Sequence, residues 1–394
     1  MKYQFAKRMA NVKKSFIREI FKVLENREVI SFSGGFPNPE SFPVEGIALA
    51  SQTVLAEDGK RILQYSSTEG YMPLRKMIAD RYLKHDGLTV SPEEVLIVNG
   101  SQQALDLIFK VFLNPGDHVI IERPAYLGAI QSLSMYEPTF HTAELKEDGI
   151  DLEMVENILK QYPVKMMYTV PNFQNPTGIT YSLKNRQKLA ELIKQYDIVL
   201  VEDDPYSELR FIGNDVLPIK TYLGDNGILL GSFSKIVSPG MRMGWVVACP
   251  EIMDKLVVAK QASDLHSNYF TQRIIFEYLS KNEIDVHIEK IKKMYKGQRE
   301  YMIECIKKYF PPEVTYTQPE GGMFMWATLP IGMSSLELFN LAVKENVVFV
   351  PGDPFYVDES NVNTLRLNYT NSDMREIEEG IKRLGKAIYG LMQK

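Results

Sequence analysis

Cysteine is scarce in this chain, since only Cys249 and Cys305 occur among 394 residues. Both lie in apolar or helical surroundings, without metal-ligand spacing and without the closely spaced pattern of a disulfide-stapled secreted domain. We therefore expect no metal site and a reducing compartment, the cytoplasm.

The chain also lacks an excess of basic residues and a long hydrophobic run. Its 45 Lys and Arg against 50 Asp and Glu give a net charge of -5, so we expect no binding of nucleic acid or of an anionic membrane. The charged, amphipathic N-terminal segment has no apolar core typical of a signal peptide or membrane span. A hydrophobic fraction of 45% and a charged fraction of 24% are typical of a folded globular protein.

From about residue 90, short apolar runs alternate with helical patterns. Apolar runs cover residues 95–98, 118–121, 164–170, 198–201, 227–231 and 243–248, and helices are predicted over 104–113, 127–135 and 183–195. This alternation predicts an α/β fold. After about residue 285, a long charged helix over 284–309, strand-like pieces and a last helix from about Ser372 indicate a second, smaller domain.

The first 45 residues do not follow the alternating pattern. They have a helix-like start and then a run rich in glycine and proline over 33–39. We expect them to join the C-terminal part. The predicted division is therefore a large domain over residues 46–285 and a small discontinuous domain over 1–45 plus 286–394.

Lys235 lies in a polar turn, residues 231–242, between two short apolar strands. An amine in such a connection can be desolvated, which lowers its pKa toward the neutral form that attacks carbonyls. Arg242, seven residues on, supplies a permanent positive charge suited to phosphate. A lysine beside phosphate-binding groups suggests pyridoxal phosphate, whereas the alternative for Lys235 alone is a solvated turn lysine.

Three further segments carry candidate residues at strand ends. Ser101 follows the strand 95–98 and opens a helix, so it could bind an anion at the helix N-terminus or serve as a plain cap. Tyr126 begins the next helix, and its ring could stack on a planar heteroaromatic ring or simply pack in the core. Two prolines and a glycine over 171–178 aim the amide of Asn175, which could donate to a ring phenolate or belong to an ordinary turn.

Three acidic residues, 202–204, close the strand 198–201. A metal is a poor fit, because no histidine is near and an oxygen-only site would show more ligands at loop spacing. An aspartate facing a pyridinium nitrogen would keep it protonated and let the ring accept electrons. Tyr206 could then share the ring oxygen with Asn175. A solvated strand end with an Asp-Pro turn is the alternative.

Taken in order along the chain, these motifs resemble the signature of the class I and II aminotransferases, which are fold type I pyridoxal phosphate enzymes. The motifs span nearly the whole chain and comprise residues 99–103, Tyr126, 171–178, 203–206, 232–242 and Arg366. Residues 33–39, 64–71 and 319–326 are most similar to the kynurenine and 2-aminoadipate aminotransferase branch. The resemblance implies a mostly parallel mixed sheet, sandwiched by helices, that binds pyridoxal phosphate, with a smaller α+β domain beside it.

The resemblance also implies roles for single residues. Lys235 forms the internal aldimine and then acts as general acid and base, and Asp203 pairs with the pyridine nitrogen. Asn175 and Tyr206 contact the ring oxygen, while Tyr126 stacks on the ring. The residues implied for the phosphate are Ser101, Gln102, Ser232, Ser234 and Arg242.

For the substrate, the resemblance implies that Arg366 clamps the α-carboxylate and that the backbone at Gly35 closes over it, beside Asn175. Tyr65 would reach the phosphate of a neighbouring subunit, which makes the active form a homodimer. The donor would be an aromatic, 2-aminoadipate-like or long aliphatic amino acid, and the acceptor a 2-oxo acid such as 2-oxoglutarate. Arg8, Arg18 and Arg27 could approach the substrate.

Two other functions remain open at this point. The same site serves C-S lyases and cyclopropane-forming synthases of the same fold. Aminotransferase-like domains also act as non-catalytic ligand sensors in some transcription regulators.

Overall fold

The computed structural model describes residues 3–10, 29–358 and 360–393. Most of the helix-like N-terminal start, including Arg18 and Arg27, lies outside these residues. Arg8 is exposed on the short helix η1 (Lys7–Ala10).

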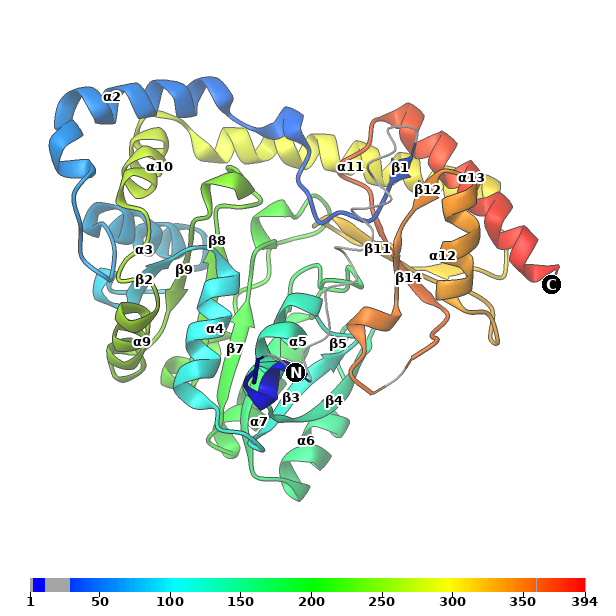
Figure 1. Cartoon of the computed structure of the whole chain (residues 1–394), viewed down its shortest axis with the longest axis horizontal. Helices are drawn as coiled ribbons and strands as arrows, with labels where there is room; N and C mark the ends of the chain where they lie inside the picture. The colour runs from blue at the N-terminus through cyan, green and yellow to red at the C-terminus, as the bar shows by residue number, and fades with distance from the viewer. Residues whose placement is uncertain (1–2, 11–28, 359, 394) are drawn as a thin grey trace.

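An eight-stranded sheet forms the centre of the larger part of the molecule (Figure 1). Its strands run in the order β2 (Val95–Val98), β9 (Gly244–Val247), β8 (Gly227–Ser232), β7 (Val199–Asp203), β6 (Val164–Thr169), β3 (His118–Arg123), β4 (Thr139–Lys146), β5 (Gly149–Ile150). Pairings with β9 or β5 are antiparallel and the others are parallel. The predicted mostly parallel mixed sheet is confirmed.

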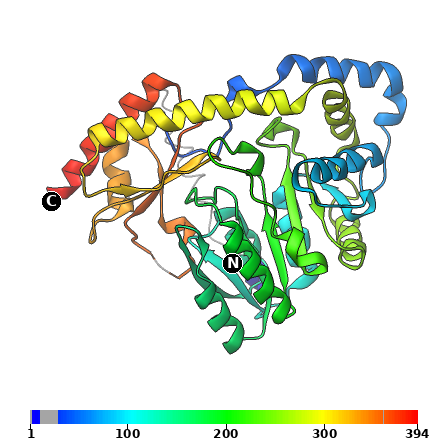
Figure 2. The ribbon, with the colours of Figure 1, turned by 180° about the vertical axis from the view of Figure 1, so that it is seen from behind.

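Helices cover both faces of this sheet. α4 (Ser101–Phe112) and α5 (Leu127–Ser134) lie on one face, and α7 (Leu183–Gln195) lies on the other (Figure 2). Successive residues of a strand face opposite sides, and accordingly Met166 and Met167 of β6 belong to two separate hydrophobic cores. Further helices of this part are α2 (Val44–Ile62), α3 (Met72–Asp86), α6 (Leu152–Gln161), α8 (Lys220–Leu223), α9 (Pro250–Ser263) and α10 (Tyr269–Lys281).

A second, four-stranded antiparallel sheet lies toward the C-terminus. Its order is β10 (Thr315–Tyr316), β11 (Phe324–Thr328), β14 (Thr364–Asn368), β13 (Val350–Pro351). The long α11 (Ile284–Tyr309) runs from the larger part to this sheet and packs on α13 (Met374–Met392), and α12 (Ser335–Lys344) lies beside α13. β1 (Ile30–Ser31) pairs in parallel with β12 (Val347–Val348). This pairing supports the proposed discontinuous small domain, whose boundaries remain predictions.

Capping residues explain why several elements begin where they do. Ser182 accepts a hydrogen bond from the backbone N–H of Asn185 and so starts α7, and Asp373 with Glu376 forms a capping box at the start of α13. The predicted helices 183–195 and 284–309 have the same bounds as α7 and α11. Short 3-10 helices occupy Pro39–Ser41, Pro92–Glu94, Ser207–Leu209, Gly224–Asn226, Pro239–Met241 and Asp353–Phe355. No described helix is long and apolar enough to cross a membrane.

Candidate active site

The candidate residues gather at one edge of the large sheet. β2, β3, β6, β7 and β8 all run in the same direction, because β9 is antiparallel to both β2 and β8. The segments that follow their carboxyl ends carry Ser101, Tyr126, Asn175, Tyr206 and Lys235. Ligands of open α/β sheets bind at this edge.

Lys235 is partly buried in the connection between β8 and β9. Its Nζ donates a hydrogen bond to the backbone oxygen of Gly35 at 2.8 Å. Burial, and then the positive charges of Arg366 and Arg242, lower the pKa of the Lys235 ammonium to about 8. A larger share of the amine is therefore neutral and nucleophilic near neutral pH than for an ordinary lysine.

Arg366 reaches the same place from β14 of the small sheet. Its side chain is only 2% exposed, and its Nη1 donates to Asn175 Oδ1 at 2.8 Å while its Nη2 donates to the backbone oxygen of Ser33 at 2.7 Å. The guanidinium lies 4.2 Å from the ring centre of Phe324. Burial lowers its pKa to about 10, which still leaves Arg366 cationic at neutral pH. Its Nε is buried without a hydrogen-bond partner.

Sheet register separates the three acidic residues. Tyr168 of β6 pairs with Val201 and Thr169 with Glu202, so Asp203 shares a face with Tyr168 whereas Glu202 points to the other face. Asp203 Oδ2 accepts a hydrogen bond from the Tyr168 hydroxyl at 2.8 Å. Asp203 Oδ1 is buried and has no partner.

Glu202 and Asp204 have structural partners. Glu202 accepts hydrogen bonds from the backbone N–H groups of Ile219 and Lys220. Asp204 accepts from the Asn172 amide at 3.0 Å and from the backbone N–H of Ser207 at 3.0 Å. Over residues 3–10, 29–358 and 360–393, no group of three or more His, Cys, Asp or Glu side chains is placed to hold a metal ion.

Several hydrogen-bond donors lie around the start of α4. Gly100 has a φ of 79°, and a Cβ there would lie 2.7 Å from Arg242 Nη2. Only glycine therefore lets the guanidinium lie against the helix N-terminus, where Arg242 Nη2 donates to the backbone oxygen of Asn99 at 3.1 Å. The hydroxyl of Ser101 is buried and has no partner. An anion at this helix end would meet a cation, a hydroxyl and free N–H groups.

The remaining phosphate candidates flank this position. Ser232 Oγ donates to Ser234 Oγ at 2.9 Å and accepts from the backbone N–H of Ser234 at 3.1 Å, which shapes the turn before Lys235. The Gln102 amide donates to the backbone oxygen of Gly128 at 2.9 Å.

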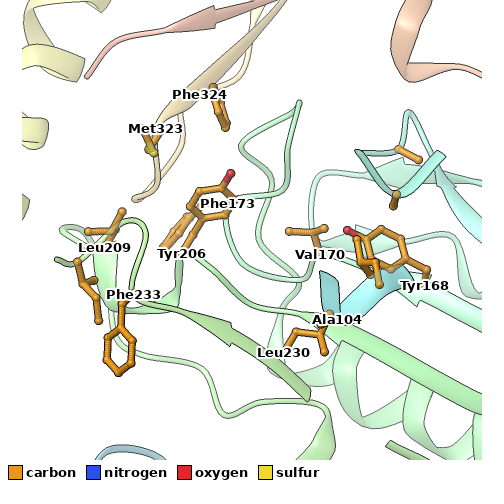
Figure 3. Close-up of a cluster of buried hydrophobic side chains, with 14 of the residues drawn as sticks. Ala104, Tyr168, Val170, Phe173, Tyr206, Leu209, Leu230, Phe233, Met323 and Phe324 are labelled. Atoms are coloured by element: carbon orange, nitrogen blue, oxygen red, sulfur yellow. The ribbon is translucent and has the colours of Figure 1, made fainter. Parts of the chain in front are cut away.

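Two tyrosines provide aromatic surface. Tyr126 caps the start of α5, and Tyr206 is buried with its ring edge-on to Phe324 at 6.1 Å. Figure 3 shows Tyr206 and Phe173 below Phe324 of the small sheet. Burial raises the pKa of both phenols, that of Tyr126 to about 12, so both stay protonated at neutral pH.

Two buried partners of the site, Tyr168 and Glu122, are not among the residues predicted from the sequence. Glu122 is 1% exposed and accepts hydrogen bonds from Thr169 Oγ1 at 2.7 Å and from Gln174 Nε2 at 2.9 Å. It thereby ties the end of β3 to the loop that carries Asn175. An acidic residue directly after the apolar run 118–121 is the same signal that singled out 202–204. Tyr168 gave no such signal within its apolar run.

Tyr65 lies in the segment between α2 and α3. Its side chain is 78% exposed, and the ring packs edge-on against His266 at 5.8 Å. Several exposed hydrophobic side chains lie on α2, on this segment and at the start of α3, namely Leu49, Leu55, Leu63 and Met72.

The family model for aminotransferase class I and II matches residues 27–384. The chain belongs to this family. It is 42% identical to aromatic-amino-acid aminotransferase 1 of Thermococcus litoralis, over 99% of this chain and 95% of that protein. The function is therefore that of a pyridoxal phosphate-dependent transaminase.

Two solved structures are similar over nearly their whole length. The kynurenine aminotransferase of Pyrococcus horikoshii, in complex with PMP, has a TM-score of 0.94 at 42% identity and covers 98% of this chain and 97% of its own. The α-aminoadipate aminotransferase LysN of Thermus thermophilus, complexed with N-(5'-phosphopyridoxyl)-L-leucine, has a TM-score of 0.92 at 42% identity, covering 99% and 98%. The aminotransferase resemblance and the predicted cofactor, pyridoxal phosphate, are confirmed.

The residues present fit this cofactor. Three buried polar atoms without partners, Ser101 Oγ, Asp203 Oδ1 and Arg366 Nε, lie in three different parts of the candidate site. Unpaired buried polar groups are costly. The cofactor phosphate would satisfy Ser101 Oγ, the ring N–H would satisfy Asp203 Oδ1, and a substrate carboxylate would satisfy Arg366 Nε. Lys235 supplies an amine with a lowered pKa.

Proposed function

We propose that this transaminase takes its amino group from aromatic amino acids, 2-aminoadipate or long aliphatic amino acids and passes it to a 2-oxo acid such as 2-oxoglutarate. One observation carries the proposal. The buried Arg366 guanidinium lies 4.2 Å from the ring centre of Phe324 and 5.3 Å from that of Phe355. A carboxylate clamp with aromatic neighbours suits α-amino acids whose side chains have large apolar parts.

The relatives support this range. The Thermococcus protein is named for aromatic amino acids, the Pyrococcus structure for kynurenine, and the Thermus structure for α-aminoadipate with a leucine adduct. A site that serves several such donors needs apolar surface as well as a place for a second polar group.

The geometry supports a role for each of the candidate residues. Bound pyridoxal phosphate supplies an electron sink for the substrate Cα. Lys235 Nζ holds the cofactor and takes the Cα proton, because a partly neutral amine is a competent base near its pKa. Arg366 orients the substrate through its α-carboxylate, beside Asn175 and the backbone at Gly35. Asp203 would pair with the ring nitrogen, Tyr206 and Asn175 would contact the ring oxygen, and Tyr126 would stack on the ring.

The phosphate is proposed to lie between the N-terminus of α4 and Arg242. Ser101 and Gln102 contribute from α4, and Ser232 and Ser234 from the turn before Lys235. Gly100 supports this assignment, since its missing Cβ makes room for the guanidinium.

We also propose a homodimer in which Tyr65 reaches the phosphate of the neighbouring subunit. The 78% exposure of Tyr65 supports it, as do the exposed hydrophobic side chains of α2. Burial of such a patch between subunits would be favourable. The proposed compartment is the cytoplasm, a proposal supported by two buried free thiols, Cys249 and Cys305.

A donor panel tests the substrate class. The purified holoenzyme is mixed with 2-oxoglutarate and single amino acids, and conversion of bound cofactor to its amine form is followed by absorbance. We expect tyrosine, phenylalanine, kynurenine, 2-aminoadipate and leucine to give kcat/KM at least about tenfold above alanine, since each added buried methylene contributes about 0.8 kcal/mol. A preference for alanine or aspartate over all five would contradict the proposal.

A further inference from the structure

We propose that Tyr168 is a positioning residue for Asp203: its hydroxyl occupies one carboxylate oxygen and leaves the other for the N–H of the cofactor ring. The inference rests on the proposed pairing of Asp203 with the ring nitrogen and deepens it. Tyr168 acts through Asp203 and does not itself reach the reacting atoms.

The contact between the two side chains is set by sheet register. Tyr168 pairs with Val201 in the parallel strands β6 and β7, and Asp203 lies two residues further on the same face. The Tyr168 hydroxyl lies 2.8 Å from Asp203 Oδ2. Tyr168 is 1% exposed and Asp203 is 2% exposed, so water does not compete for this hydrogen bond.

The surrounding core holds Tyr168 in place. Its ring belongs to a buried hydrophobic cluster that also contains Ala104, Val170 and Leu230 (Figure 3). A side chain confined in this way keeps its hydroxyl on Oδ2, and Asp203 Oδ1 is left buried without a partner. An unsatisfied carboxylate oxygen in the core is costly unless a donor arrives, and the ring N–H is such a donor.

The direction of the hydrogen bond is also set. Burial, and then the negative charge of Asp203, raise the pKa of Tyr168 well above its ordinary value, so the phenol stays protonated and donates. Burial, with the nearby charges of Asp204 and Glu122, raises the pKa of Asp203 to about 7, and the Tyr168 hydrogen bond opposes that rise. The other phenols near Asp203, Tyr126 and Tyr206, are protonated and carry no charge.

The consequence is a larger charged fraction of Asp203 near neutral pH than burial alone would leave. A carboxylate is the form that can accept the ring proton, and Tyr168 favours it over the neutral acid. Without the hydroxyl, Asp203 shifts toward the protonated form, which cannot stabilise a protonated ring nitrogen.

Tyr168→Phe tests this inference, because it removes the hydroxyl and keeps the ring. We expect kcat to fall by about tenfold with KM changed less than about twofold, as for the loss of one hydrogen bond to a charged group. Nitrogen NMR of enzyme loaded with ¹⁵N-labelled pyridoxal phosphate measures the ring proton directly. We expect partial loss of the protonated signal in Tyr168→Phe at neutral pH.

Tyr136→Phe is the matched control. Tyr136 also donates to an aspartate, Asp106 Oδ1, at 2.7 Å, but none of the candidate site residues takes part in that contact. The control is expected to keep the wild-type nitrogen signal and kcat. An equal loss in both variants would mean that removing a buried phenol has a general structural cost, and it would overturn the inference.

One further variant, Asp203→Asn, separates this inference from the proposed site. If Asp203→Asn keeps both the ring proton and kcat, the pairing of Asp203 with the ring nitrogen is wrong and the inference fails with it. If Asp203→Asn loses both and Tyr168→Phe matches wild type, only the role of Tyr168 is wrong.

Discussion

Lys235 combines burial with two nearby positive charges and one hydrogen bond to a backbone oxygen. The charges of Arg366 and Arg242 add to desolvation, and together they bring the pKa of its ammonium to about 8. The hydrogen bond to Gly35 holds Nζ in one place before the cofactor binds. The same surroundings that make the amine nucleophilic thus also prepare sites for two anionic groups, a phosphate and a carboxylate.

The lowered pKa of Lys235 predicts how cofactor loading depends on pH. The neutral amine attacks the aldehyde, so the rate of covalent attachment of pyridoxal phosphate to the apoenzyme should rise with pH and level off above about 8. Arg366→Gln removes one of the two nearby charges and should move the midpoint upward. Stopped-flow absorbance measures both midpoints. A midpoint near pH 10 in the wild type would contradict the prediction. The Lys235→Ala variant is the negative control and should show no covalent attachment.

At the scale of elements, the sequence predicted much of the fold and part of the site. α7 and α11 have the predicted bounds, because their apolar periodicity and flanking residues are local signals. The role of Tyr168 was not predictable, because it depends on the register between β6 and β7. The contact of Arg366 with Asn175 joins two different sheets, and no local pattern encodes such a meeting.

The junction between β2 and α4 gives a prediction about a single element end. Gly100 has φ 79° and ψ 165°, a conformation that only glycine adopts readily. Gly100→Ala should cost about 1–3 kcal/mol of stability, and its Cβ should displace the Arg242 guanidinium. We therefore expect the Kd of the non-covalent analogue pyridoxine 5'-phosphate to rise at least about tenfold, since charge-assisted hydrogen bonds to phosphate contribute about 1.5–3 kcal/mol.

Gly116→Ala is the matched control for that variant. Gly116 also has a positive φ, 85°, but nothing lies within 4 Å of a Cβ built there. The Gly116→Ala variant should be less stable than the wild type but should keep the wild-type affinity for pyridoxine 5'-phosphate. Equal affinity in Gly100→Ala and wild type, measured by isothermal titration calorimetry, would show that Arg242 is not held against α4 for phosphate binding.

For the whole molecule, the candidate site is where the two sheets meet. Arg366 of β14 contacts Asn175 beyond β6, Thr317 Oγ1 donates to the backbone oxygen of Thr177 at 2.7 Å, and Lys235 reaches Gly35 near β1. Each contact links the small sheet or the N-terminal segment to a loop of the large sheet. A ligand bound at this junction is therefore expected to stabilise both parts of the chain together.

The last prediction concerns removal of the cofactor. A ligand that binds only the folded state adds about 2.7 kcal/mol at a hundredfold excess over its Kd, so the holoenzyme should have a Tm at least a few degrees above that of the apoenzyme. Because the site joins both sheets, differential scanning calorimetry should show the whole transition shifting upward. Lys235→Ala with the same concentration of pyridoxal phosphate should gain less, since its cofactor is not covalently held. A shift confined to one of two separate transitions would instead mean that the sheets unfold independently and that the contacts of Arg366 and Lys235 do not couple them.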